Sequence, residues 1–323
     1  MKDLKQRGDN EVAKVLKYVF GPVPSRRLGR SLGINNIPKK YCSYSCVYCQ
    51  VGRTTNLTVD RSAFYEPGDV VKEVLLAVED ACGKIDYITF VPDGEPTLDV
   101  NLGKIINGIK EATENRVAVL TNGSLISSAS GDLFNADLVS VKIDAIAEET
   151  YRRVNRPHPS LSIFKVLGEI ERFSKDFGGT LITETMLLEG VNDGPEDLSK
   201  VAEFLAQLSP QRAYLSVPVR PPTEPWVRPS KRISEWYERL GAAGIKAEML
   251  NYQEEGAFGT AGFEDPVSGI LKIMNVHPLR EDYARRILLE GGVDPDKTIH
   301  ELVKGRKVRR VEYGGKAYLA PAD

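Results

Sequence analysis

Residues 32–49 have the sequence Leu-Gly-Ile-Asn-Asn-Ile-Pro-Lys-Lys-Tyr-Cys-Ser-Tyr-Ser-Cys-Val-Tyr-Cys. This stretch places a β-prone run, Leu32 to Ile37, shortly before Cys42, Cys46 and Cys49. The chain has only four cysteines, so three of them fall within eight positions. Clustered cysteines in a cytosolic protein more often bind a metal or an iron–sulfur cluster than form disulfides. The stretch therefore predicts such a site in the loop after a first strand.

The spacing of the cysteines favours an iron–sulfur cluster over zinc. Three thiolates bind three irons of a [4Fe-4S] cluster and leave the fourth iron open to a ligand that is not a side chain. Structural zinc takes four ligands, and the three histidines are all distant in sequence. Cys42, Cys46 and Cys49 are the predicted cluster ligands, with three buried free thiols as the alternative. We expect Cys82 to be a core thiol.

Outward from the cysteines, short β-prone runs alternate with segments whose apolar residues recur at helical spacing. This alternation is typical of repeated βα units around a parallel sheet. The predicted strands are Leu32–Ile37, Tyr87–Val91, Val117–Thr121, Leu138–Ile143, Leu181–Leu187 and Ala213–Val217. Six strands fall short of an eight-stranded barrel. We therefore expect an α/β fold built on an open, partial (βα)6 TIM-like barrel.

The composition divides the chain into four segments. We expect a basic N-terminal arm over residues 1–31, the barrel over 32–250 and a Gly-rich linker over 251–265. Residues 266–323 predict three short helices followed by a hairpin at Gly314-Gly315, because two glycines suit a turn that needs positive φ at both positions. That order describes a small winged-helix-like domain.

Length and charge limit the class of protein. The 323 residues are enough for two domains, and the formal net charge of -2 excludes a uniformly basic nucleic-acid binder. No apolar run approaches the ~20 residues of a membrane span, and the first residues lack the apolar stretch of a signal peptide. We expect a cytoplasmic protein with no membrane partner.

Three further motifs follow or occupy predicted strands. They are Asp93-Gly-Glu-Pro-Thr-Leu98, Thr121-Asn-Gly123 and Ser140-Val-Lys-Ile-Asp144. Side chains at alternate strand positions share a face, so Ser140, Lys142 and Asp144 should point together into the barrel or its mouth. Barrel enzymes place their sites at the carboxyl ends of the strands, where these motifs and the cysteine loop should meet.

With these motifs the sequence resembles the radical S-adenosylmethionine (radical SAM) superfamily, whose motif is C-x3-C-x2-C with an aromatic residue, here Tyr48, before the last cysteine. The resemblance covers roughly residues 20–220. It implies a [4Fe-4S] cluster whose open iron binds S-adenosyl-L-methionine. It also implies one-electron cleavage of that cofactor to methionine and a 5′-deoxyadenosyl radical, which abstracts hydrogen from a substrate.

The resemblance also implies which residues bind S-adenosylmethionine. Gly94 and Glu95 would hold the methionine amino group, with Asp93 replacing the first glycine of the family's Gly-Gly-Glu motif. The other implied contacts are Tyr48, Pro96, Asn122, Ser140, Lys142, Asp144 and Val217, the last through its backbone near adenine. Internal pairing of Lys142 with Asp144 is the alternative. Arg220 would face the substrate, and no side chain is assigned as catalytic.

Two more motifs point to a branch of the superfamily. Asn155-Arg-Pro-His-Pro159 and the opening Gly21-Pro-Val-Pro-Ser-Arg-Arg-Leu-Gly-Arg30 are similar to the broad group that includes the tRNA wybutosine-synthesis enzymes. Those enzymes carry additional N-terminal cysteines for a second cluster. No cysteine precedes Cys42 here, so we expect a single cluster.

Two cationic segments indicate what kind of molecule the protein could bind. Lys304, Arg306, Lys307, Arg309 and Arg310 lie within seven residues, and residues 266–323 hold eleven Lys/Arg against eight Asp/Glu. Such local charge predicts contact with a phosphate backbone, with a protein-binding winged helix as the alternative. Arg26, Arg27 and Arg30 would either clamp phosphate or pair with carboxylates of the barrel.

The sequence thus predicts a radical SAM enzyme, with RNA modification as the first hypothesis for the substrate and protein or peptide modification as the second. An iron–sulfur nucleic-acid-binding regulator is a hypothesis from another class. The resemblance implies a low-potential electron donor such as ferredoxin or flavodoxin.

Overall fold

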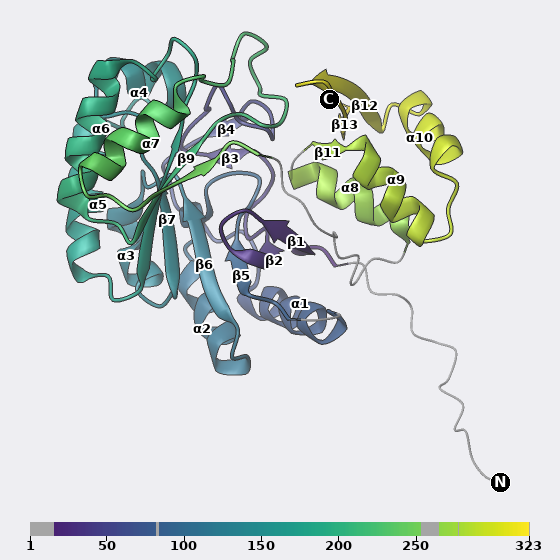
Figure 1. Cartoon of the computed structure of the whole chain (residues 1–323). Helices are drawn as coiled ribbons and strands as arrows, with labels where there is room; N and C mark the ends of the chain where they lie inside the picture. Colours follow the sequence, from purple (N-terminus) through teal and green to yellow (C-terminus); the bar gives the residue numbers. More distant parts are fainter. Residues whose placement is uncertain (1–15, 82–83, 253–264, 277, 323) are drawn as a thin grey trace.

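The computed structural model describes residues 16–81, 84–252, 265–276 and 278–322. Cys82 and most of the predicted linker lie outside these residues. The described chain forms a curled sheet covered by helices and a smaller C-terminal unit beside it (Figure 1).

The main sheet has eight strands in the order β1-β2-β5-β6-β7-β8-β9-β10. From β2 to β10 all neighbours are parallel, whereas β1 is antiparallel to β2. The strands are β1 (Val19–Ser25), β2 (Gly29–Ile34), β5 (Tyr87–Phe90), β6 (Arg116–Thr121), β7 (Leu138–Lys142), β8 (Thr180–Met186), β9 (Arg212–Ser216) and β10 (Ala247–Leu250). The α/β fold with a partial TIM-like barrel is confirmed.

The six predicted strands are all present, displaced by a few residues, and the sheet adds one strand at each edge. The expectation of an arm over residues 1–31 is wrong for its described part, because Val19–Ser25 pairs with β2. β10 extends the sheet at the other edge by pairing with β9. The sheet therefore has eight strands, two more than the six that the sequence predicts.

The helices of this unit lie on the outer face of the sheet (Figure 1). In α2 the apolar stripe Leu102, Ile105, Ile106 and Ile109 is fully buried, so the helical spacing does identify the face that packs on the sheet. The helices are α1 (Pro67–Asp80), α2 (Leu102–Ala112), α3 (Ile126–Leu133), α4 (Glu148–Asn155), α5 (Ile163–Asp176), α6 (Pro195–Leu208) and α7 (Ile233–Ala242), with a short 3-10 helix at Pro96–Leu98.

The C-terminal unit comprises the described residues 265–276 and 278–322. Its elements are α8 (Pro266–Val276), β11 (Leu279–Arg280), α9 (Glu281–Glu290), α10 (Pro295–Lys304), β12 (Val308–Tyr313) and β13 (Lys316–Pro321). The three helices and the hairpin are where the sequence predicts them, and Gly314 and Gly315 have φ of 55° and 70°. Strand β13 lies between β11 and β12. The winged-helix assignment stays a prediction.

Within the described residues, no helix is both long and apolar enough to cross a bilayer.

The last helix of the barrel gives a direct test of its packing. Trp236 on α7 is fully buried, whereas its neighbour Tyr237 is 43% exposed. Trp236→Ala should lower the free energy of unfolding by about 3–5 kcal/mol, because it removes a large core side chain. Tyr237→Ala should change it by less than about 0.5 kcal/mol. Chemical denaturation measures both, and equal small losses would contradict α7 as part of the core.

Candidate active site

The cysteine loop is held to the barrel on several sides. It starts in β3 (Tyr41–Cys42), which pairs with β4 (Asn56–Leu57). The backbone N–H groups of Ser45 and Val47 donate to the carbonyls of Asn155 (3.0 Å) and Val154 (2.9 Å), at the end of α4. The motif Asn155-Arg-Pro-His-Pro159 therefore supports the loop that carries the cysteines.

The three thiols are free and partly buried. Burial raises the pKa of Cys42 and Cys49, and it raises the pKa of Cys46 to about 12. N–H groups nevertheless point at the sulfurs: Asn155 Nδ2 lies 3.5 Å from Cys46 Sγ, and Tyr44 N lies 3.5 Å from Cys42 Sγ. Such donors favour a thiolate. Binding iron would thus release protons from these cysteines.

This donor set fits an iron–sulfur cluster better than a single ion. Across the described part of the chain, no three His, Cys, Asp or Glu side chains converge as ligands of one metal ion. The thiolates of a [4Fe-4S] cluster bind three different irons, so they need not converge on one point. Three partly buried sulfurs on one loop, with N–H donors around them, meet the requirements of that cluster.

The turn after β5 packs tightly against the cysteine loop. Lys40 N donates to Asp93 O (2.8 Å), and Glu95 N donates to Tyr41 O (3.0 Å). A Cβ on Gly94 would overlap the carbonyl oxygen of Tyr41 and so displace the backbone next to Cys42. Glycine at 94 is required here by this close approach of two backbones.

Two buried carboxylates, Asp93 and Glu95, flank Gly94. Glu95 accepts hydrogen bonds from Thr97 N (3.1 Å), Thr97 Oγ1 (2.6 Å), Thr121 Oγ1 (2.6 Å) and Asn122 N (2.7 Å). It therefore fastens the turn to β6, and its contact with the methionine amino group stays a prediction, as does that of Pro96. Asp93 is also buried, and burial raises its pKa to about 7.

Asn122 connects this turn to the cysteines. Its Nδ2 donates to Ser43 Oγ (2.8 Å) and lies 3.7 Å from Cys42 Sγ. The motif Thr121-Asn-Gly123 thus reaches the predicted cluster loop directly, and a contact of Asn122 with the cofactor stays a prediction.

The polar row predicted on β7 points into the half-barrel. Lys142 Nζ lies 3.3 Å from Glu184 Oε1 on β8 and 3.8 Å from Asp144 Oδ1, and burial lowers its pKa. Ser140 is buried on the same strand face. The alternative of internal pairing is present in the structure, with Glu184 as the nearer partner. Cofactor contacts of Ser140, Lys142 and Asp144 stay predictions.

Asp144 joins the row to the cysteine loop. It accepts hydrogen bonds from the Tyr48 hydroxyl, from Asn155 Nδ2 (2.8 Å) and from Met186 N (2.8 Å). The aromatic residue before Cys49 is thus tied to the carboxyl end of β7. Asn155 is not among the predicted cofactor contacts, since Cys46, one of its partners, lies 109 positions away in the sequence.

The turn between β1 and β2 reaches the same interior. Arg27 pairs with Glu184, and Arg26 Nη1 donates to Leu250 O (2.8 Å) at the end of β10. Arg27 therefore pairs with a barrel carboxylate, as the second alternative predicts, whereas Arg26 donates to backbone carbonyls at the end of β10.

Val217 follows β9 and is buried, and Arg220 Nη1 donates to Gln50 Oε1 (3.1 Å), next to Cys49. The loop after β9 therefore lies beside the cysteine loop. Adenine contact by Val217 and substrate contact by Arg220 remain predictions.

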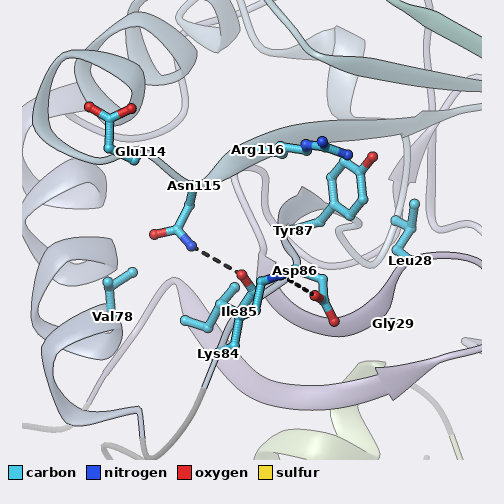
Figure 2. Close-up of a pocket in the computed structure, with 10 residues that line it drawn as sticks. All are labelled: Leu28, Gly29, Val78, Lys84, Ile85, Asp86, Tyr87, Glu114, Asn115 and Arg116. Carbon is cyan, nitrogen blue, oxygen red and sulfur yellow. Dashed lines mark hydrogen bonds and ion pairs between the residues drawn. The ribbon is translucent and has the colours of Figure 1, made fainter.

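A cavity of about 630 Å³ lies at the amino ends of the strands, opposite to the end that carries the cysteine loop. Figure 2 shows the residues that line it. Gly29, Tyr87 and Arg116, at the amino ends of β2, β5 and β6, line it. It is separate from the candidate active site.

Comparisons with known proteins identify the family of the chain. Residues 36–205 match the radical SAM superfamily. A radical SAM methyltransferase of Sphaerobacter thermophilus has the same fold, with 21% identity, a TM-score of 0.50 and coverage of 69% of this chain and 67% of that one. The chain belongs to the radical SAM superfamily. It is an enzyme of this class, whose members use a [4Fe-4S] cluster and S-adenosylmethionine.

Two relatives found by sequence are similar to this chain over different fractions of its length. A UPF0026 protein of Methanocaldococcus jannaschii is 42% identical over 94% of this chain and 95% of its own length. A probable dual-specificity RNA methyltransferase of Thermotoga petrophila is 24% identical over 67% of this chain and 63% of its own length.

The close approach at Gly94 predicts a specific defect. Gly94→Ala should reduce iron content after anaerobic reconstitution to a small fraction of the wild-type value, because the added Cβ displaces Tyr41 and Cys42. Gly131→Ala on α3 is the control, since a Cβ there meets nothing within 4 Å. Iron per chain is the measurement, and full cluster assembly in Gly94→Ala would contradict the account.

Proposed function

We propose that this protein is a radical SAM enzyme that modifies RNA by abstracting a hydrogen atom from it. The proposed chemistry is supported by the position of Cys42, Cys46 and Cys49 on one loop at the carboxyl ends of the parallel strands. N–H donors lie near the sulfurs of this loop. When bound, the cluster and S-adenosylmethionine supply one-electron cleavage of a C5′–S bond, which gives methionine and a 5′-deoxyadenosyl radical.

In this proposal the residues of the chain bind the cluster and orient the cofactor. The three cysteines hold the cluster and leave one iron for the cofactor. The turn Asp93–Glu95 and the side chain of Asn122 fix the cysteine loop, and Tyr48 with Asp144 closes its other end. The polar row in the half-barrel gives the cofactor charged and hydrogen-bonding partners away from bulk water.

The electron has to come from a partner. We propose a low-potential donor such as ferredoxin or flavodoxin, in the reducing cytoplasm, where an iron–sulfur cluster with an open iron survives. The partly exposed cysteines leave the cluster close enough to the surface for such a donor.

The RNA part of the proposal rests on the C-terminal unit. Lys304, Arg306 and Lys307 are exposed and make no ion pair with the described residues. Arg310 is different, because it pairs with Glu281 (2.7 Å). Three unpaired cations on a short surface segment suit a phosphate backbone. The similarity to an RNA methyltransferase supports the same substrate class.

The chemistry predicts a product. Anaerobically reconstituted protein, given dithionite and S-adenosylmethionine, should form 5′-deoxyadenosine and methionine. Each of Cys42→Ala, Cys46→Ala and Cys49→Ala should abolish both products because a ligand of the cluster is lost, whereas Cys82→Ala should retain them. Chromatography of the nucleoside is the measurement, and no 5′-deoxyadenosine from the wild type would overturn the radical chemistry.

The basic segment predicts the salt dependence of RNA binding. Replacing Lys304, Arg306 and Lys307 together by alanine should weaken binding and reduce the slope of log affinity against log salt by about 2, at about 0.7 for each lost phosphate contact. Lys165 and Lys175 on α5, which are exposed, and Lys200 on α6, which is partly exposed, give a control triple with the same change in charge. An unchanged slope, or an equal change in the control, would count against RNA contact by this segment.

A further inference from the structure

The C-terminal unit touches the barrel at two separated places. On one side Val23 of β1 packs against the core of this unit, and Lys272 Nζ donates to Leu16 O. On the other side the hairpin β12–β13 reaches the loop that follows β9. Tyr313 and Tyr318 make this second contact.

Both tyrosines donate to backbone carbonyls of that loop. Tyr313 OH lies 3.0 Å from Pro218 O, and Tyr318 OH lies 2.9 Å from Val219 O. Tyr318 is fully buried, and burial raises the pKa of Tyr313. A backbone carbonyl in an irregular loop needs a hydrogen-bond donor when water is excluded, and the two hydroxyls supply it.

The same loop continues onto the cysteine loop. Arg220 Nη1 donates to Gln50 Oε1 (3.1 Å), Thr223 Oγ1 donates to Cys49 O, and Glu224 N donates to Val47 O (3.1 Å). Residues 218–224 thus contact the two tyrosines at one end and, at the other end, the backbone of the loop that carries the predicted cluster ligand Cys49. Val217, the predicted adenine contact, directly precedes Pro218.

We propose that Tyr313 and Tyr318 are positioning residues that hold residues 217–224 beside the cysteine loop, so that the C-terminal unit completes the binding site for the adenosyl end of S-adenosylmethionine. The inference rests on the proposed function for the nature of the cofactor. It adds a role for the C-terminal unit that does not depend on RNA. Loosening the hairpin would weaken cofactor binding while leaving the three cysteines in place.

The experiment measures binding to the full-length, reconstituted protein. The variant is Tyr313→Phe with Tyr318→Phe, which removes two hydroxyls and keeps both rings. Tyr237→Phe, which removes a hydroxyl at an exposed position of α7, is the control. Iron content, melting temperature, and the Kd of S-adenosylmethionine and of 5′-methylthioadenosine, which lacks the amino-acid moiety, are compared by anaerobic calorimetry.

We expect the double variant to keep its iron and to bind both ligands about tenfold more weakly, as two lost neutral hydrogen bonds would give. Unchanged affinities with a lower melting temperature would overturn the proposal, because the tyrosines would then only anchor the unit. Weaker binding of S-adenosylmethionine alone would also overturn it. If the double variant loses iron, the same criterion is applied to Tyr313→Phe alone.

This readout separates the inference from the proposed function. Binding needs neither a reductant nor a substrate. A wild-type protein that binds both ligands but makes no 5′-deoxyadenosine would therefore sink the radical chemistry and leave the positioning role testable.

Discussion

The contact between the Gly94 turn and the carbonyl of Tyr41 is the constraint on which the site depends. It brings the end of β5 against the backbone that leads into Cys42, at a separation that only glycine allows. The hydrogen bonds of Glu95 then attach the same turn to β6, and Asn122 continues from there to Ser43. The cysteine loop is thereby fixed at Tyr41 and Ser43 by the ends of two parallel strands, β5 and β6, where this fold places its chemistry.

The interior of the half-barrel is organised by charge as well as by apolar packing. Glu184 receives Arg27 from the first hairpin and Lys142 from β7, so a buried carboxylate is neutralised by cations from distant parts of the chain. Unpaired, such a group would be costly to bury. Asp144, 3.8 Å from Lys142, also accepts hydrogen bonds from the Tyr48 hydroxyl and from Asn155, which support the cysteine loop. The C-terminal unit adds a further support through the loop after β9.

Local pattern was enough to predict the inner strands and the cysteine loop, but not the edges of the sheet or the pairing of the charges. Val19–Ser25 contains Gly21, Pro22 and Pro24, which argue against a strand, yet an edge strand tolerates them because it pairs on one side only. Ala247–Leu250 is four residues with no β-branched side chain, so pairing with β9, rather than local propensity, makes it a strand. Likewise Arg27, Asn155 and Arg310 have partners far away in sequence, which no spacing rule reaches.

The central claim is that three cysteines hold a [4Fe-4S] cluster with one iron left for S-adenosylmethionine. Electron paramagnetic resonance of the reduced, reconstituted protein, recorded with and without S-adenosylmethionine, tests it most directly. The account predicts a [4Fe-4S] signal that changes when the cofactor is added, because the cofactor binds an iron that no side chain occupies. A signal that stays the same in the presence of saturating S-adenosylmethionine would contradict it.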